Sequence, residues 1–254
     1  MLIAEAVCGV VFAVIISCIL LRQWKHQQRM QEQNEAQEIM TVLNEENTTP
    51  EETETQSVSV NAGATMPPVF EAAQQLLDQN PDFVGMVGFD DMALYVCQSN
   101  DNTFYASHRF DGSSDETGMI YMDCRCSVWP LSDNTILYGH NMRDGSRFGK
   151  LKRMTNMEYV DANPIIRFAS LYEIHEYAPI AVFYANADST EETFDWAQIQ
   201  FQSFQDYENY IENITNRSIL KLQTEAQYGD SLLTLVTCSE RETGNRLIVV
   251  CVAQ

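Results

Sequence analysis

Apolar residues are unevenly distributed along the chain, and their spacing divides it into three parts. Residues 2–21 are almost entirely apolar, a length that spans a hydrocarbon core of ~30 Å as a helix. Residues 22–43 are rich in Gln, Glu and good helix formers, which predicts a polar continuation of the helix. Residues 44–68 have too few apolar side chains to build a core. We therefore expect a transmembrane anchor at 1–21, a polar helix and disordered acidic linker at 22–68, and a folded domain at 69–254.

The folded part begins with one helix and continues with strands. Phe70, Ala73 and Leu77 lie on one helical face, and Asn80-Pro81 ends that helix. Short apolar runs bounded by turn residues then predict strands. These are residues 83–87, 93–97, 119–122, 135–138, 165–168, 172–175, 180–184, 232–238 and 246–252. Many short strands with few helices are typical of a mainly β protein, and we expect a closed antiparallel barrel.

Two helical stretches interrupt the predicted strands. Residues 147–154 have the pattern of a short helix. The longest connection, 185–231, places Tyr207, Tyr210, Ile211 and Ile214 on one face at helical spacing. We expect this second helix to pack on the barrel.

Composition excludes several functions. A net charge of -21 argues against nucleic-acid binding, because a phosphate backbone needs a basic surface. The seven cysteines show no small-domain disulfide pattern. The only close pair is Cys124-Arg125-Cys126, which is too tightly spaced for a C-x2-C metal knuckle and has no adjacent His. We therefore expect neither a metal site nor a cofactor.

The candidate chemistry lies near the C-terminus, at the end of the Thr234-Leu-Val-Thr-Cys238 strand. A polar turn follows Cys238, and Arg246 begins the next apolar run. If the two strands are neighbours, the thiol and the guanidinium face one another, and the cation favours the nucleophilic thiolate. The ordinary alternative for any single cysteine is a small buried apolar residue. A third stretch, Tyr138-Gly-His-Asn-Met142, follows the apolar strand at 135–137.

These three stretches together resemble the sortase transpeptidases, whose signature is a Thr-Leu-x-Thr-Cys strand, an upstream histidine and an arginine soon after the cysteine. The likeness is to class B. It includes Asn80–Gly85, Gly118–Asp123 and the whole of Asn134–Leu151, and it covers about residues 69–254. It implies an eight-stranded barrel with a helix in the long connection, beside the groove for a sorting peptide.

The resemblance also implies roles for single residues. Cys238 is the expected nucleophile, His140 the acid and base, and Arg246 the donor to the developing oxyanion. Arg241, in the same turn as Cys238, is the rival cation. Thr237 is expected to bond substrate or steady its loop. Asn102 resembles a substrate-contacting asparagine of class B, and a turn asparagine is the equal alternative.

The implied function is a membrane-anchored cysteine transpeptidase of a Gram-positive-type cell surface. Its partners are surface proteins that carry a sorting motif and an amine of the cell wall or of a pilin. Arg22, Lys25 and Arg29 follow the apolar segment and none precedes it, so the positive-inside rule alone places the domain in the cytoplasm. We follow the resemblance and expect an extracellular domain, because the substrates are exported. A signal peptide is disfavoured, since no basic region precedes the apolar segment.

Two alternatives remain. The first is another thiol peptidase of the papain type, which places its cysteine upstream of its histidine, whereas His140 precedes Cys238 here. The second is an inactive sortase-like barrel used as a surface binding or scaffold module. The complete set of His140, Cys238 and Arg246 argues against the second.

Overall fold

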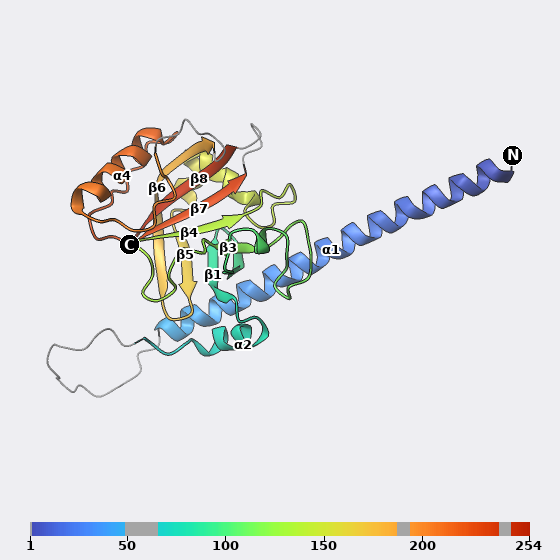
Figure 1. Ribbon diagram of the computed structural model, residues 1–254, viewed down its shortest axis with the longest axis horizontal. Helices are drawn as coiled ribbons and strands as arrows, with labels where there is room; N and C mark the ends of the chain where they lie inside the picture. Colours follow the sequence, from blue (N-terminus) through green and yellow to red (C-terminus); the bar gives the residue numbers. More distant parts are fainter. Residues whose placement is uncertain (1, 49–65, 187–193, 239–244) are drawn as a thin grey trace.

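The computed structural model describes residues 2–48, 66–186, 194–238 and 245–254, and Figure 1 shows their arrangement. The helices are α1 Leu2–Thr48, α2 Glu71–Gln79, α3 Met157–Ala162 and α4 Phe204–Arg217, with 3-10 turns η1 Phe104–Ala106 and η2 Gly149–Thr155. The strands are β1 Phe83–Phe89, β2 Met92–Cys97, β3 Ile120–Met122, β4 Asn134–Gly139, β5 Ile166–Ser170, β6 Ile174–Asn186, β7 Leu232–Cys238 and β8 Asn245–Ala253.

The eight strands form one closed barrel in the order β1-β2-β3-β4-β7-β8-β6-β5. The barrel is mixed: β2 and β3 are parallel, as are β4 and β7, and the other neighbours are antiparallel. The prediction of a closed eight-stranded barrel is confirmed, whereas its purely antiparallel character is wrong. Parallel neighbours need long crossovers. Residues 98–119 separate β2 from β3, and residues 140–231, which include β5 and β6, separate β4 from β7. The sequence does not show that these strands are neighbours.

Strand β6 unites two predicted strands, 172–175 and 180–184. Pro179 lies in its middle and pairs opposite Cys251 of β8. Proline lacks an N–H, and the register shifts between Pro179 and Ala181, so the strand continues through a local bulge. The sequence analysis predicts two separate strands here, and the structure joins them.

The helices largely follow the sequence pattern. The α4 helix begins at Phe204, with the Ser203 side chain accepting a hydrogen bond from the Asp206 N–H. Its buried residues Tyr207, Tyr210 and Ile214 belong to the barrel's apolar cluster, and the helix lies against β6. The stretch predicted as one helix at 147–154 is the 3-10 turn η2, and α3 follows it.

A second apolar cluster lies between the outer face of the barrel and helices α1 and α2. From α1 it includes Ala36, Met40 and Leu43, which recur on one helical face and are almost fully buried. The described fold therefore includes part of α1, N-terminal to Val69, where the sequence predicted that the folded domain begins. The linker residues 49–65 lie outside the described residues, so the predicted domain boundaries remain predictions.

Helix α1 is continuous and projects away from the barrel toward the N-terminus (Figure 1). Residues 10–21 are all exposed, among them the large apolar side chains of Phe12, Ile15 and Leu20. In the described part of the chain, no helix has a stretch that is both long and apolar enough to cross a membrane.

Candidate active site

His140 follows the last residue of β4. Gly139, just before it, is packed so closely that an added Cβ would lie 2.4 Å from Ile120 Cδ1 and 2.8 Å from Phe148 Cδ2. The backbone of His140 is also held on its other side, because the N–H groups of Met142 and Phe148 both donate to its carbonyl oxygen. The position of the histidine is thus set by a tight strand end and a bonded loop.

The His140 ring is half-buried and bonded to the connection between β2 and β3. Its Nε2 lies 2.7 Å from the carbonyl oxygen of Ala106, at the end of η1. A carbonyl oxygen only accepts, so Nε2 carries the proton in this bond. The nitrogen that can exchange a proton with a substrate is then Nδ1.

The strand registers bring the three predicted catalytic positions to one end of the barrel. Strand β7 lies between β4 and β8, with Gly139 opposite Thr237 and Cys238 opposite Arg246. His140, one residue beyond Gly139 on the parallel neighbour, is therefore at the level of Cys238. The structure describes the backbone of Cys238 and not its side chain, and Arg241 lies outside the described residues.

Arg246 is half-buried near the start of β8, between Cys238 of β7 and Ala185 of β6. Within the described residues, its guanidinium forms no ion pair and no hydrogen bond. A guanidinium in this setting can donate two N–H groups in one plane to an anionic oxygen and a neighbouring carbonyl.

Thr237 and Asn102 are placed differently from each other. Thr237 is only 2% exposed, and its hydroxyl has no hydrogen-bond partner in the described chain, so it is enclosed by protein. Asn102 is half-buried, and its Oδ1 accepts a bond of 2.8 Å from the Cys124 N–H. That bond joins the β2–β3 connection, which also supplies Ala106, to the loop after β3.

A buried carboxylate near this end was missed by the sequence analysis. Asp123 is fully buried and accepts bonds from Arg125 and from the Tyr138 hydroxyl, the latter at 2.9 Å. Burial opposes ionisation of Asp123, but the bonds from Arg125 and Tyr138 outweigh it and lower its pKa. Tyr138 lies two residues before His140 on β4, so this network anchors the strand that carries the histidine. No sequence spacing pointed to it.

Helix α1 bonds to the same segments that hold His140. Arg29 and His26 contact Asp144, in the loop after the histidine, at 2.9 and 3.2 Å. Lys25 lies 3.4 Å from Asp115, in the connection that supplies Ala106. These contacts were also missed, because the polar pattern of 22–43 was interpreted as a helix outside the folded domain.

Three of the other described cysteines are poorly suited to act as a nucleophile. Cys97, Cys126 and Cys251 are buried, and burial raises the pKa of each thiol, that of Cys126 to about 11. They therefore stay protonated at neutral pH. Cys124 is exposed and is not bonded to Cys126 as a disulfide. Within the described ranges, no group of three or more His, Cys, Asp or Glu side chains could hold a metal ion.

The remaining described histidines have local partners. His108 stacks on Phe104, with ring centroids 4.1 Å apart, and bonds to its carbonyl oxygen. His175 lies 3.1 Å from Glu173. Neither lies on β4, β7 or β8, whereas His140 directly follows β4, the parallel neighbour of the strand that ends at Cys238.

Known proteins with similar sequences and folds are sortases of class B. No protein-family model matches the chain. A Listeria monocytogenes protein named Sortase B is 28% identical over 172 residues, covering 67% of this chain and 68% of that protein. Sortase B of Staphylococcus aureus is 28% identical over 187 residues, covering 72% and 73% respectively.

Solved structures extend this likeness over most of the chain. A Bacillus anthracis protein described as similar to sortase B matches with a TM-score of 0.70 and 27% identity, over 89% of this chain and 96% of that one. A Staphylococcus aureus sortase B–substrate complex matches with a TM-score of 0.75 and 21% identity, over 91% and 98%. The barrel, the N-terminal helices and the likeness in sequence lead to one conclusion: the chain is similar in sequence and in fold to the sortases of class B.

Proposed function

We propose that the protein is a cysteine transpeptidase that cleaves a C-terminal sorting motif after a threonine and transfers the resulting acyl group to an amine. The observation that carries the proposal is the register of three neighbouring strands. It sets Cys238 opposite Arg246 and level with His140, at one end of the barrel. The likeness in sequence to sortase B proteins supports the same assignment.

The reaction has two acyl-transfer steps. The Cys238 thiolate attacks the scissile carbonyl carbon, the C–N bond breaks, and the His140 imidazolium gives its proton to the leaving amine. A thioester now joins the substrate's threonine to Cys238. In the second step an incoming amine loses a proton to neutral His140 and attacks the thioester, which restores the thiolate and the imidazolium. The Ala106 carbonyl, by holding Nε2–H, leaves Nδ1 to carry the proton.

Arg246 is the proposed oxyanion donor. Its guanidinium has no other partner within the described chain, so it is available to the oxygen that becomes negative in each step. Asn102 is a proposed substrate contact. Its Oδ1 accepts the bond from the Cys124 N–H, and its side-chain amide N–H groups are the proposed donors to the substrate. Thr237, being enclosed, supports the loop after β7 in this account.

The proposed location is the cell membrane, in a single pass, with the barrel outside. The exposed apolar side chains of residues 10–21 support an anchor at 1–21, and the substrates and acceptors of the proposed reaction lie outside the cell. The proposed partners are surface proteins that carry sorting motifs and an amine of the cell wall or a pilin lysine. The Staphylococcus aureus sortase B–substrate complex supports a substrate of this class.

The test is a panel of sorting-motif peptides incubated with a soluble amine, with the products identified by mass. We expect cleavage after threonine and a product joined to the amine. Cys238→Ala should abolish both products, whereas Cys124→Ala, which removes an exposed thiol of the same barrel, should keep them. Full activity in a folded Cys238→Ala protein would refute the proposal.

A further inference from the structure

His140 is held from two sides, by two separate segments of the chain. In the connection between β2 and β3, the carbonyl oxygen of Ala106 lies 2.7 Å from its Nε2. In the loop after β4, the Phe148 N–H donates to the His140 carbonyl oxygen at 3.0 Å. The orientation of the ring therefore depends on how these two segments are fixed relative to each other.

Arg147 fixes the loop after β4. It directly precedes Phe148 and forms an isolated bridge with Asn141, and its φ of 52° lies in the left-handed region that residues other than glycine rarely adopt. Its side chain is only 3% exposed, and its Nη1 donates to Glu32 of α1 at 2.5 Å. The Nε and Nη2 atoms have no hydrogen-bond partner in the described chain, so this buried cation depends on Glu32.

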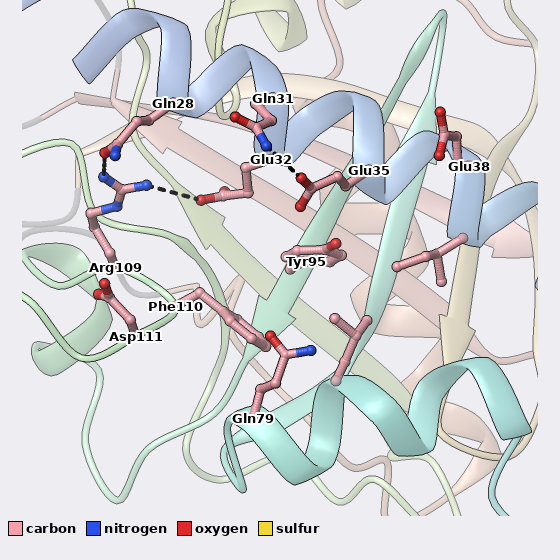
Figure 2. A pocket seen from close by; sticks show the side chains of 12 residues that line it. Gln28, Gln31, Glu32, Glu35, Glu38, Gln79, Tyr95, Arg109, Phe110 and Asp111 are labelled. Carbon is pink, nitrogen blue, oxygen red and sulfur yellow. Dashed lines mark hydrogen bonds and ion pairs between the residues drawn. The ribbon is translucent and has the colours of Figure 1, made fainter. Parts of the chain in front are cut away.

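Glu32 also contacts the connection that supplies Ala106. Its Oε1 accepts the bond from Arg147, and its Oε2 lies 3.8 Å from Arg109, three residues after Ala106. Figure 2 shows Arg109 beneath α1, joined by dashed lines to Glu32 and to Gln28. The two oxygens of one carboxylate thus contact both of the segments that hold the histidine.

Two cations of α1 support the same segments. Lys25 lies 3.4 Å from Asp115, whose N–H donates to the carbonyl oxygen of Ser107, one residue beyond η1. Arg29 donates to Asp144, in the loop after β4, at 2.9 Å. These ion pairs, like those of Glu32, end on the two segments that hold the histidine.

We propose that Glu32 of α1 is a positioning residue for His140. Through Arg147 and Arg109, its carboxylate keeps the two segments in the arrangement that places the Ala106 carbonyl on Nε2. The hydrogen bond of one ring nitrogen sets the tautomer of an imidazole, so Glu32 acts on the protonation of the ring without touching it. The effect on turnover rests on the proposed transpeptidase function, whereas the effect on the tautomer does not.

The ring nitrogens of His140 give a readout that needs no activity. The chain has four histidines, so ¹⁵N NMR of the full chain in detergent, labelled at histidine, gives few signals, and His140→Gln assigns one pair. At a pH where the imidazoles are neutral, the wild type should carry this proton on Nε2. In Glu32→Gln the two nitrogen shifts should move toward each other, because the tautomer is no longer fixed. Unchanged shifts in a folded Glu32→Gln protein overturn the proposal.

Turnover gives the second readout. In Glu32→Gln, kcat should fall on the order of tenfold with KM for the peptide nearly unchanged, because a misplaced acid and base slows the chemical step. A rise in KM at constant kcat would contradict positioning of His140. A wild type without transpeptidase activity would refute the proposed function, and the nitrogen shifts would then decide this inference alone.

Control variants separate positioning from a general loss of stability. Met40→Ala removes a buried apolar side chain of the same helix, so it should also destabilise the fold, but it should leave the His140 shifts and kcat near wild type. Glu35→Gln, an exposed carboxylate of α1, should change neither readout. If Glu32→Gln does not fold, Arg29→Gln, which removes a bond to the loop after β4, should shift the nitrogens in the same direction by less. Equal changes in Met40→Ala and in the Glu32 or Arg29 variant contradict the assignment, because α1 would then act only through stability.

Discussion

Charged side chains are held differently in two regions of the molecule. One region is the end of the barrel where β4 and β7 finish and β8 begins, and the other is the face of the barrel beneath α1. Beneath α1 the cations are paired: Arg29 with Asp144 at 2.9 Å and Arg147 with Glu32 at 2.5 Å. At the strand ends, Arg246 has no such partner in the described chain. Charge that is paired stabilises the fold, whereas charge that is left unpaired in a half-buried position is available to a substrate.

The comparison predicts that the two regions respond differently to substitution. Changes to the charged side chains at the strand ends should reduce activity with little effect on stability. Changes beneath α1 should reduce stability first. Four variants test this difference.

The largest effect is expected at Arg246. Arg246→Lys keeps the charge but loses the planar pair of donors, so turnover should fall on the order of a hundred- to a thousand-fold. Single-turnover acylation measures the loss, and iodoacetamide alkylation across pH should stay near wild type if charge alone tunes the thiol. Arg167→Lys, an exposed change on β5, is the control. Near-normal acylation would mean that Arg246 contributes only its charge, and Arg241 would then be the candidate oxyanion donor.

A second variant removes a charge beneath α1. Glu32→Gln leaves the Arg147 side chain, only 3% exposed, without its carboxylate. Removing one partner of a buried pair is strongly destabilising, so we expect a loss of about 3 kcal/mol in the free energy of unfolding. Urea denaturation measures it, with Glu35→Gln as the control, since Glu35 on the same helix is exposed and forms no ion pair within the described chain. Equal, small losses in both would show that the Glu32–Arg147 pair contributes little.

A third variant should lower both stability and activity. Gly139→Ala places a Cβ against Ile120 and Phe148, and overpacking of this kind costs about 1–3 kcal/mol. Because His140 is the next residue, activity should fall as well. Gly88→Ala on β1 is the control, since its Cβ would meet no atom closer than 3.4 Å. A stable and fully active Gly139→Ala protein would mean that the strand end is not tightly constrained.

The smallest effect concerns pH. Burial opposes ionisation of Asp144, but bonds from Ser146, Arg29 and His26 hold its pKa well below the usual value. A depressed folded-state pKa contributes stability above the unfolded pKa of about 4, and that contribution is lost as pH falls further. The stability difference between wild type and Asp144→Asn should therefore shrink below about pH 4, by about 1 kcal/mol for a partly exposed pair. Urea denaturation across pH tests it, with exposed Asp161→Asn as control, and a difference that grows on acidification would contradict it.

The sequence predicted most of the barrel because its strands are short apolar runs separated by turn residues. The helix at Phe204–Arg217 was equally clear from the spacing of Tyr207, Tyr210 and Ile214. The two parallel pairings were not predictable in this way, because neighbours in space are set by crossovers rather than by local pattern. Strand β6 was predicted as two strands, 172–175 and 180–184, and its continuity through Pro179 depends on the pairing with β8, which the local pattern does not show.

Motifs in the sequence predicted the residues of the candidate site, but not the buried carboxylate and the α1 contacts that surround it. Cys238, His140 and Arg246 each stand beside an apolar strand, so their positions could be inferred from sequence, and their catalytic roles remain a prediction. Asp123 and the α1 contacts depend on side chains that meet from distant segments. In α1 the buried apolar residues are Ala36, Met40 and Leu43, and polar residues surround them in the sequence. Three apolar positions are too weak a pattern to predict that the helix packs on the barrel.

The most direct test of the central claim is the mass of the enzyme during turnover. The protein is quenched in acid soon after mixing with a sorting-motif peptide and no amine, digested, and searched for the acyl adduct. The account predicts one adduct, of the mass of the peptide up to its threonine, on the fragment that contains Cys238. It also predicts that the adduct disappears when amine is added. An adduct on Cys124 instead, or cleavage of the peptide with no adduct on any cysteine, would contradict the account.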